Sequence, residues 1–349
     1  MGLDRASGIR IGRGTPGEKN LITDVPGVRV GHATIRDGAG VNTGVTAVLP
    51  HGGNLFRDKV MAACAVLNGF GKTMGLVQVE EMGTIETPIL MTNTLSIGTA
   101  ATALIEYMLR QNPDIGLETG TVNPLVCECN DGRLNDIRGL HVRAEHVVEA
   151  LDAAAPMFEE GAVGAGTGMC CLGLKGGIGS ASRVVTLDAR TYTVGALVLS
   201  NFGEAGRLLI NGRHVGEEIQ AGQSAQGDRG SIIMLLATDI PLSERQLRRL
   251  CRRAGVGLAR TGSYYGNGSG DIAIAFTTAN RVPHYSESAF VPVTMMDDEH
   301  IDPVLDMSAE AVEEAIVSSL YHAQTTVGRD GTVQRGLREY LGQSAQSSL

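Results

Sequence analysis

The run Ser231-Ile-Ile-Met-Leu-Leu-Ala237 constrains the fold more than any other feature of this 349-residue sequence. A half-exposed strand alternates apolar and polar residues, whereas uninterrupted hydrophobicity over a strand length means that both faces are covered. The segment 221–230 directly before it is rich in Gly, Ser, Gln and Asp without periodicity, which predicts a flexible surface loop. The chain therefore passes from a polar loop into the middle of a layered structure at the bond between Gly230 and Ser231.

Other segments predict a mixed α/β fold around that strand. Strands are expected where apolar residues alternate or run together, and helices where they recur at helical spacing after a capping residue. The predicted strands are 28–35, 43–49, 124–129, 192–200, 231–237 and 271–278, and the predicted helices are 96–110, 145–155, 243–258 and 308–327.

Charge and hydropathy narrow the class of partner. The net charge is −9 and the Lys and Arg residues are scattered, so no basic stripe is present that could neutralise a phosphate backbone, and nucleic acid is not expected as a partner. No apolar run approaches the length of a membrane span, and residues 1–20 lack the charged-then-apolar layout of a signal peptide. We therefore expect a cytoplasmic protein that acts on a small molecule or peptide, without a membrane.

The sequence contains no complete motif for a metal site or a nucleotide site. The eight histidines are dispersed, and the cysteines lack the Cys-x-x-Cys spacing of zinc or redox motifs, so we expect buried free thiols and no metal or cofactor. Gly71-Lys72-Thr73 resembles the end of a Walker motif, but the upstream glycine that the motif requires is replaced by Val66. The glycine-rich stretch 161–168 does not satisfy Gly-x-Gly-x-x-Gly and predicts tight turns or close backbone approach.

A serine nucleophile in this chain needs an unusual base, because the Gly-x-Ser-x-Gly elbow of ordinary serine hydrolases is missing. An N-terminal serine supplies its own base, since its α-amino group has a pKa of about 7.7–8.0 and can accept the hydroxyl proton near neutral pH. An internal serine must first be exposed by cleavage of the preceding bond, and a glycine before it leaves the carbonyl sterically open. Gly230 and Ser231 meet both demands, although Gly-Ser before a strand is common.

Several segments in order along the chain resemble the DmpA-like family of L-aminopeptidase/D-esterases and β-aminopeptidases, whose members cleave themselves into two chains. They include PLVCECNDGRLND at 124–136, VGALVLSNFG at 194–203 and GSIIMLLATDIPL at 230–242. The remaining segments are 15–32, 166–169, 175–179 and 268–276. Each is short, but their spread over nearly the whole sequence makes the resemblance specific.

The resemblance implies roles for four catalytic residues. Ser231 aligns with the nucleophile, and Asn201 aligns with the oxyanion-hole Asn, whose amide can donate to the developing alkoxide. Ser269 and Asp271 align with a Ser-x-Glu pair that orients the nucleophile and its amine, with Asp here in place of Glu. The carboxylate is kept, and its reach is shorter by one methylene. Without the resemblance, Asn201 and the stretch Gly-Ser-Gly-Asp would be interpreted as ordinary turn residues.

Glu128 lies in the otherwise apolar segment 124–129, where an unpaired buried carboxylate would be costly, so a cationic partner is expected. The resemblance implies that this carboxylate binds the free amino group of the substrate. A structural salt bridge to an Arg is the alternative, and the residues alone do not separate the two.

The resemblance also implies a four-layer α/β/β/α sandwich like that of N-terminal nucleophile hydrolases but with different connectivity. It implies one domain over 1–349, processed into chains 1–230 and 231–349 and assembled as a homotetramer.

The predicted function is therefore a self-cleaving serine aminopeptidase that releases N-terminal amino acids from small peptides, amides or esters through an acyl-enzyme on Ser231. Two alternatives remain from the sequence: an acyltransferase of the related ornithine acetyltransferase type, and an uncleaved small-molecule-binding protein.

Overall fold

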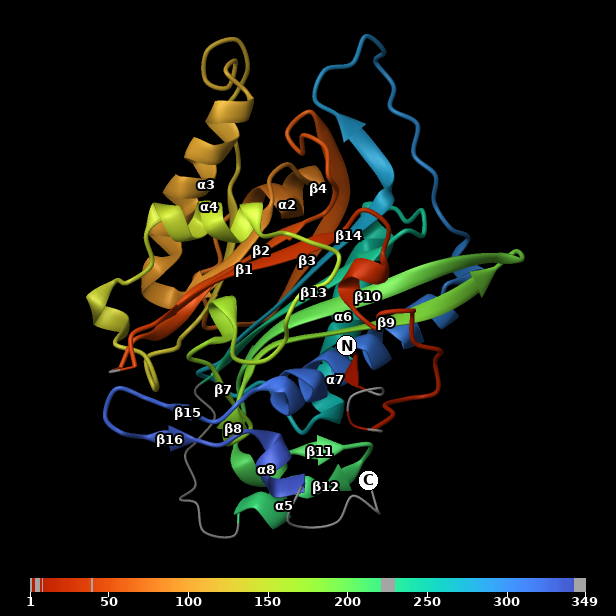
Figure 1. Cartoon of the computed structure of the whole chain (residues 1–349). Coiled ribbons are helices and arrows are strands. Elements are labelled where there is room, and N and C mark those ends of the chain that lie inside the picture. Colours follow the sequence, from red (N-terminus) through yellow and green to blue (C-terminus); the bar gives the residue numbers. More distant parts are fainter. Residues whose placement is uncertain (1, 4–6, 8, 39, 221–229, 342–349) are drawn as a thin grey trace.

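The molecule has four layers of secondary structure (Figure 1). The structure is a computed structural model that describes residues 2, 3, 7, 9–38, 40–220 and 230–341. Two sheets pack face to face, and their facing residues form one apolar cluster that includes Met91, Cys127, Leu199 and Ile233. Helices cover the outer face of each sheet, so the order of layers is α/β/β/α. This is the predicted fold class. The predicted loop 221–230 lies outside the described residues except for Gly230.

The larger sheet has six strands in the order β4-β3-β14-β13-β10-β9. Their bounds are Thr84–Ile85 (β4), Asp58–Gly69 (β3), Gly270–Pro283 (β14), Ser231–Thr238 (β13), Arg190–Asn201 (β10) and Gly177–Leu187 (β9). All residues of β13 are buried, as its uninterrupted apolar run predicts. β13 is parallel to β14 and antiparallel to β10, so the start of β13 meets the start of β14 and the end of β10 at one edge of the sheet.

The smaller sheet has four strands in the order β1-β2-β5-β6. Their bounds are Arg29–Arg36 (β1), Asn42–Leu49 (β2), Ile89–Asn93 (β5) and Leu125–Cys129 (β6). Helices α3 (Ile97–Gln111) and α4 (Ala144–Asp152) cover its outer face with an apolar cluster that includes Leu104 and Val147. β5 and β6 are parallel, so both end toward the same side of the molecule.

Helices α6 (Glu244–Arg260) and α7 (Asp302–His322) cover the outer face of the six-stranded sheet. The N-terminus of α6 is capped by Ser243, whose side chain accepts a hydrogen bond from the Gln246 N–H. Shorter elements complete the fold: α2 (Leu76–Met82), α5 (Val215–Gln220), α8 (Leu337–Leu341), β7 (Cys170–Cys171), β8 (Leu174–Lys175), β11 (Leu209–Ile210), β12 (Arg213–His214), β15 (Thr326–Val327) and β16 (Val333–Gln334).

Each predicted strand and helix is present, but one helix is wrong at both ends. The helix predicted over 308–327 begins at Asp302, because Pro303 is tolerated in the first turn of a helix, and ends at His322. The residues that follow adopt an extended conformation, and Thr326 and Val327 pair with Val333 and Gln334 as a small hairpin.

Two long strands, β3 and β9, have no counterpart in the sequence prediction. β9 reads GIGSASRVVTL, and its glycines and serines resemble a loop. The structure gives the reason for Gly179, since a Cβ atom there would lie 1.9 Å from the Ala315 carbonyl oxygen of α7. The small residues allow the helix to approach the sheet closely.

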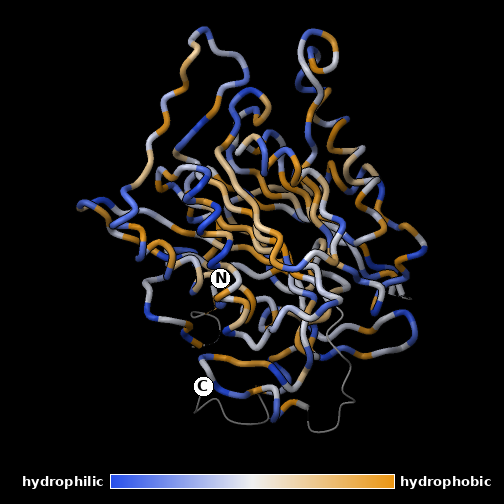
Figure 2. Tube along the Cα trace, turned by 180° about the vertical axis from the view of Figure 1, so that it is seen from behind, coloured by the Kyte–Doolittle hydropathy of each residue, from blue (hydrophilic) through white to orange (hydrophobic). Residues whose placement is uncertain are grey.

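The apolar residues are concentrated along the central strands of both sheets (Figure 2). All six cysteines are free, as predicted, and all but the partly exposed Cys170 are buried. Over the described part of the chain, none of the helices combines the length and apolarity needed to cross a membrane.

Candidate active site

Ser231 is the first residue of β13 and lies between the ends of two neighbouring strands. Its register partners are Asn201, the last residue of β10, and Gly270, the first residue of β14. The side chain is nearly buried, with 6% of the residue exposed. The topology thus brings a serine, an asparagine amide and a glycine N–H together at one edge of the sheet.

Gly230 stands where no other residue fits. A Cβ atom on Gly230 would lie 1.9 Å from the Asn201 carbonyl oxygen and 2.4 Å from the Phe202 Cα. Both atoms belong to the backbone, so they cannot move aside as a flexible side chain would. The residue before Ser231 is therefore glycine for a steric reason that the structure makes explicit.

One backbone N–H donates to both the Ser231 hydroxyl and the Gly230 carbonyl. Gly270 N–H lies 3.3 Å from the Gly230 carbonyl oxygen and 3.2 Å from Ser231 Oγ. A donor on a carbonyl oxygen polarises it and stabilises negative charge that develops there during attack. The Ser231 hydroxyl and the Gly230 carbonyl thus share one donor, the Gly270 N–H.

Ser269 and Asp271 flank Gly270 and are joined to each other. Ser269 Oγ donates a hydrogen bond of 2.8 Å to Asp271 Oδ1, and both residues are buried. Because the Ser269 hydroxyl directs its only hydrogen at the carboxylate, it presents only lone pairs to other neighbours. The pairing of β14 with β3 shifts register between Asp271 and Ile272, and such bulges occur often beside active sites.

The side-chain amide of Asn201 is held from both ends. Its Oδ1 accepts a hydrogen bond of 2.9 Å from the Cys170 N–H, and its Nδ2 donates one of 3.0 Å to the Asn130 carbonyl. An amide nitrogen carries two hydrogens, so the Asn130 bond accounts for one of them. The arrangement fixes the orientation of the amide before any substrate binds.

Glu128, in β6, accepts hydrogen bonds from neutral donors. Oε1 accepts from the Lys72 backbone N–H at 2.7 Å, and Oε2 accepts from the Thr94 hydroxyl. None of the ion pairs among the described residues includes Glu128, although only 3% of the residue is exposed. The structural salt bridge considered from the sequence is thus not formed within this part of the chain.

The Glu128 carboxylate lies close to the β14 end of the site. A Cβ atom built on Gly71 would lie 3.6 Å from Glu128 Oε1 and 3.6 Å from the Gly270 Cα, so those two atoms are less than twice that distance apart. Glu128 therefore joins Ser231, Asn201, Ser269 and Asp271 in one location, which we call the Ser231 site.

The electrostatic environment of the Ser231 site is negative. Burial first, and then the charge of Asp271, raise the pKa of the Tyr265 phenol. Burial first, and then the charge of Glu128, raise the pKa of the Cys129 thiol well above its usual value. A negative potential around a nearly buried nucleophile favours a ligand that carries a positive charge.

Some residues of the site were missed from the sequence. The Gly270 N–H, the Lys72 N–H and the Thr94 hydroxyl act through backbone or hydroxyl groups in loops and at strand ends. In the sequence Gly71-Lys72-Thr73 is a broken Walker motif, and because β3 was not predicted, no local signal places the Lys72 N–H beside Glu128.

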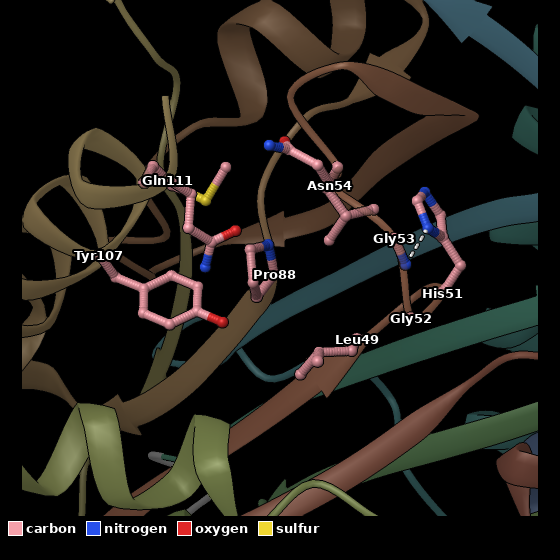
Figure 3. A pocket seen from close by; sticks show the side chains of 10 residues that line it. Leu49, His51, Gly52, Gly53, Asn54, Pro88, Tyr107 and Gln111 are labelled. Carbon is pink, nitrogen blue, oxygen red and sulfur yellow. Dashed lines mark hydrogen bonds between the residues drawn. The ribbon is translucent and has the colours of Figure 1, made fainter. Parts of the chain in front are cut away.

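No group of three or more His, Cys, Asp or Glu residues that could hold a metal ion occurs among residues whose positions are described. A cavity of about 210 Å³ lies between the end of β2 and the C-terminal part of α3, with Leu49, Asn54, Tyr107 and Gln111 in its wall (Figure 3). It opens near the start of β5, whereas Glu128 lies beside the end of that strand, so the cavity is separate from the Ser231 site.

Comparison with known proteins places the chain among peptidases. The model of peptidase family S58 matches residues 20–334. The chain is 40% identical to the β-peptidyl aminopeptidase BapA of Sphingosinicella microcystinivorans, over 92% of this chain and 86% of that protein.

Two solved structures resemble the fold closely. The PH0078 protein from Pyrococcus horikoshii OT3 is 54% identical with a TM-score of 0.93, and the match covers 97% of this chain and 96% of that one. The L-aminopeptidase D-Ala-esterase/amidase from Ochrobactrum anthropi is 38% identical with a TM-score of 0.90, over 99% of both chains. The latter is described as a prototype for the serine aminopeptidases and as a new variant of the Ntn hydrolase fold.

Proposed function

The chain belongs to peptidase family S58 and is an aminopeptidase, and from that premise we propose that it cleaves itself between Gly230 and Ser231 and then uses Ser231 as its nucleophile. The observation that carries the proposal is the Gly270 N–H shared by Ser231 Oγ and the Gly230 carbonyl, next to a position that admits only glycine. Processing yields chains 1–230 and 231–349 of one domain.

Self-cleavage proceeds by an N-to-O acyl shift. Ser231 Oγ attacks the Gly230 carbonyl carbon and loses its proton, and the Gly270 N–H donates to the oxygen that becomes negative. The bond from that carbon to the Ser231 nitrogen breaks, the nitrogen takes up a proton, and an ester remains. Water hydrolyses the ester, which leaves a carboxylate on Gly230 and a free amine on Ser231.

In turnover the new amine of Ser231 takes the proton of its own hydroxyl, whose oxygen attacks the substrate carbonyl and forms an acyl-enzyme that water hydrolyses. Asn201 donates to the oxyanion in both halves of the reaction. The Ser269 hydroxyl, bonded to Asp271, accepts from the α-ammonium and orients it.

Glu128 binds the free amino group of the substrate. Its carboxylate is buried among neutral donors within the Ser231 site, and the surrounding potential is negative, so a substrate ammonium gains a charge-assisted partner there. A substrate must therefore present an amino group next to the carbonyl that is attacked, which describes an N-terminal amino acid of a small peptide, amide or ester.

Of the three functions left open by the sequence, the family match supports the peptidase over acyl transfer and over an inactive binding protein. The relatives named above include a β-peptidyl aminopeptidase and an L-aminopeptidase D-Ala-esterase/amidase. A panel of p-nitroanilides of L-alanine, D-alanine and β-alanine compares these substrate classes directly, and release of free amino acid in the presence of an amine acceptor separates hydrolysis from transfer.

The experiment that tests the proposal is a denaturing gel of the purified protein and of the Ser231→Ala variant. We expect the wild type to give two bands that correspond to 1–230 and 231–349, and the variant to give one full-length band without hydrolytic activity. A wild type that remains a single band on incubation overturns self-cleavage. Activity in Ser231→Ala overturns the nucleophile.

We further propose a cytoplasmic homotetramer. Large apolar side chains are exposed on the segment that follows β14, with Phe290 at 85% and Met295 at 62% exposed, and contact between copies would cover such side chains. Light scattering after size exclusion measures the oligomeric state, and cell fractionation measures the location.

A further inference from the structure

Lys175, the last residue of β8, is fully buried and donates to three backbone carbonyls. Its Nζ lies 2.9 Å from the Gly166 oxygen, 2.8 Å from the Met169 oxygen and 2.8 Å from the Gly176 oxygen. An ammonium group carries three N–H donors and a neutral amine only two. The three contacts therefore match the charged form of the side chain.

Among the residues that the structure describes, no carboxylate forms an ion pair with this buried ammonium. Lys175 takes part in none of the ion pairs formed within the described ranges, and burial lowers its pKa to about 7. The ionisable groups that act on it through space are Cys170, Arg36, Asp131 and Cys171. A buried ammonium without a carboxylate in direct contact is costly, and an apolar side chain would fill the space at less cost. The charge therefore has a use other than packing.

One of the three carbonyls, that of Met169, leads toward the Ser231 site. Met169 O, which accepts from Lys175 and also from the Gly176 N–H at 3.0 Å, belongs to the same peptide unit as the Cys170 N–H. That N–H donates to Asn201 Oδ1 at 2.9 Å. A continuous chain of hydrogen bonds thus runs from the Lys175 ammonium through one peptide to the side-chain amide of Asn201.

We propose that Lys175 is a positioning residue for the oxyanion-stabilising amide of Asn201, acting through the peptide that joins Met169 to Cys170. The inference rests on the role of Asn201 in the proposed function. The positive charge polarises the peptide and fixes its plane, so that the Cys170 N–H holds Oδ1 and the amide nitrogen becomes a stronger, better-aimed donor. Hydrogen bonds in such chains strengthen one another by about 10–30% per bond.

A double-mutant cycle tests the proposal. Lys175→Met, Asn201→Ala and the double variant are compared with the wild type by the rate of self-cleavage on denaturing gels and by kcat and KM on the processed enzyme. Removal of one oxyanion donor costs on the order of 10²–10³ in kcat. Because Lys175 acts through that donor, we expect Lys175→Met alone to lower kcat and the self-cleavage rate about tenfold with KM within about twofold. In the Asn201→Ala background we expect less than a twofold effect.

The outcomes separate this inference from the proposed function. An equal, additive loss from Lys175→Met in both backgrounds overturns the relay and leaves the role of Asn201 intact. Full activity of Lys175→Met overturns the relay as well. Full activity of Asn201→Ala overturns the oxyanion role of Asn201, and the relay with it.

Two further variants guard against a loss of folding. Lys59→Met removes another lysine, 12% exposed and paired with Glu86 away from the site, and we expect unchanged kcat for its folded fraction. If Lys175→Met does not fold, Lys175→Gln replaces it in the cycle, since its amide retains two donors for the same carbonyls. A smaller loss that disappears in the Asn201→Ala background supports the relay, and an additive one overturns it.

Discussion

Two regions of the molecule bury charged side chains in opposite ways. In the first, which we call the Arg183 cluster, Arg183 lies 3.2 Å from Glu310 and 2.6 Å from Glu314, and it also donates to the Ser182 and Ile11 carbonyls. The three charged side chains are almost fully buried. The cluster joins the N-terminal segment, β9 and α7, and every charge in it has an opposite charge in contact.

At the Ser231 site, by contrast, buried charges lie beside neutral groups. Glu128 contacts an N–H and a hydroxyl, and the neighbouring Lys175 contacts three carbonyls. In the Arg183 cluster each charge has an opposite charge inside the chain, and removal of either partner is expensive. A buried charge surrounded by neutral dipoles remains able to act on something else, and for Glu128 we propose that this is the substrate ammonium.

The largest expected effect on the rate of self-cleavage comes from a side chain added at Gly230. In Gly230→Val the new side chain collides with the backbone of Asn201 and Phe202, so the carbonyl leaves the Gly270 N–H. A misplacement of about 1 Å costs about 10²-fold in rate, so we expect self-cleavage to slow by that factor or more. The gel assay measures it. Gly120→Ala is the matched control, because nothing lies within 4 Å of the added Cβ. A variant that processes at the wild-type rate would falsify the steric argument.

The loss of the cation in the Arg183 cluster has the largest expected effect on stability. Arg183→Met leaves Glu310 and Glu314 buried without their partner, and we expect a loss of about 3–5 kcal/mol in the free energy of unfolding, measured in urea. The kcat of the folded fraction should be unchanged. If Arg183→Met has normal stability but no activity, the Arg183 cluster serves catalysis and not the stability of the fold.

Glu128→Gln should behave in the opposite way. The amide keeps an oxygen for the Lys72 N–H but loses the charge that holds the substrate ammonium, which is worth about 2–4 kcal/mol. We expect kcat/KM for aminoacyl anilides to fall by roughly 10²-fold while the free energy of unfolding stays the same. The control is an N-acetylated substrate, whose slow hydrolysis should be the same in both proteins. A fall in stability like that of Arg183→Met would make Glu128 a structural residue.

The smallest expected effect is a loss of stability at low pH that comes from the burial of His32. His32 bonds to Thr46 and to the Glu159 carbonyl, and burial lowers its pKa to about 4 from 6.5. The unfolded chain binds a proton below pH 6.5 that the folded chain binds only near pH 4, so stability is lost as the pH falls through this interval. At pH 5 the loss is on the order of 1–2 kcal/mol.

Urea titrations at pH 7 and pH 5 measure this loss, and His32→Gln should reduce the difference between the two pH values. An unchanged difference in that variant would assign acid sensitivity to another group. The activities of Glu128→Gln and the wild type are best compared near pH 7, because His32 is largely neutral there in both the folded and the unfolded chain.

Much of the fold was predictable from local pattern. β13 is a strand buried on both faces because its sequence is apolar throughout, and the predicted helices follow apolar spacing and capping residues such as Ser243. β9 was not predictable, because its glycines and serines are explained only by the close approach of α7 at Gly179. The end of α7 was also missed, since the pairing of Thr326 with Gln334 is a contact between segments.

The sequence by itself determined the location of the candidate nucleophile and the class of chemistry. Gly230 before Ser231, followed by a buried strand and without a serine-hydrolase elbow, is compatible with an N-terminal serine, which needs no separate base, and the family resemblance selects Ser231 as the candidate. The resemblance then supplied roles for Asn201, Ser269 and Asp271.

Only the tertiary structure decided how these groups meet. The parallel pairing of β13 with β14 gives Ser231 and Gly230 a common donor in the Gly270 N–H, and the register with β10 places Asn201 opposite Ser231. The end of β6 in the other sheet contributes Glu128. Backbone donors carry no side-chain signature, and a carboxylate reveals its partner only when its neighbours are known, so neither could be recognised until the strands were aligned.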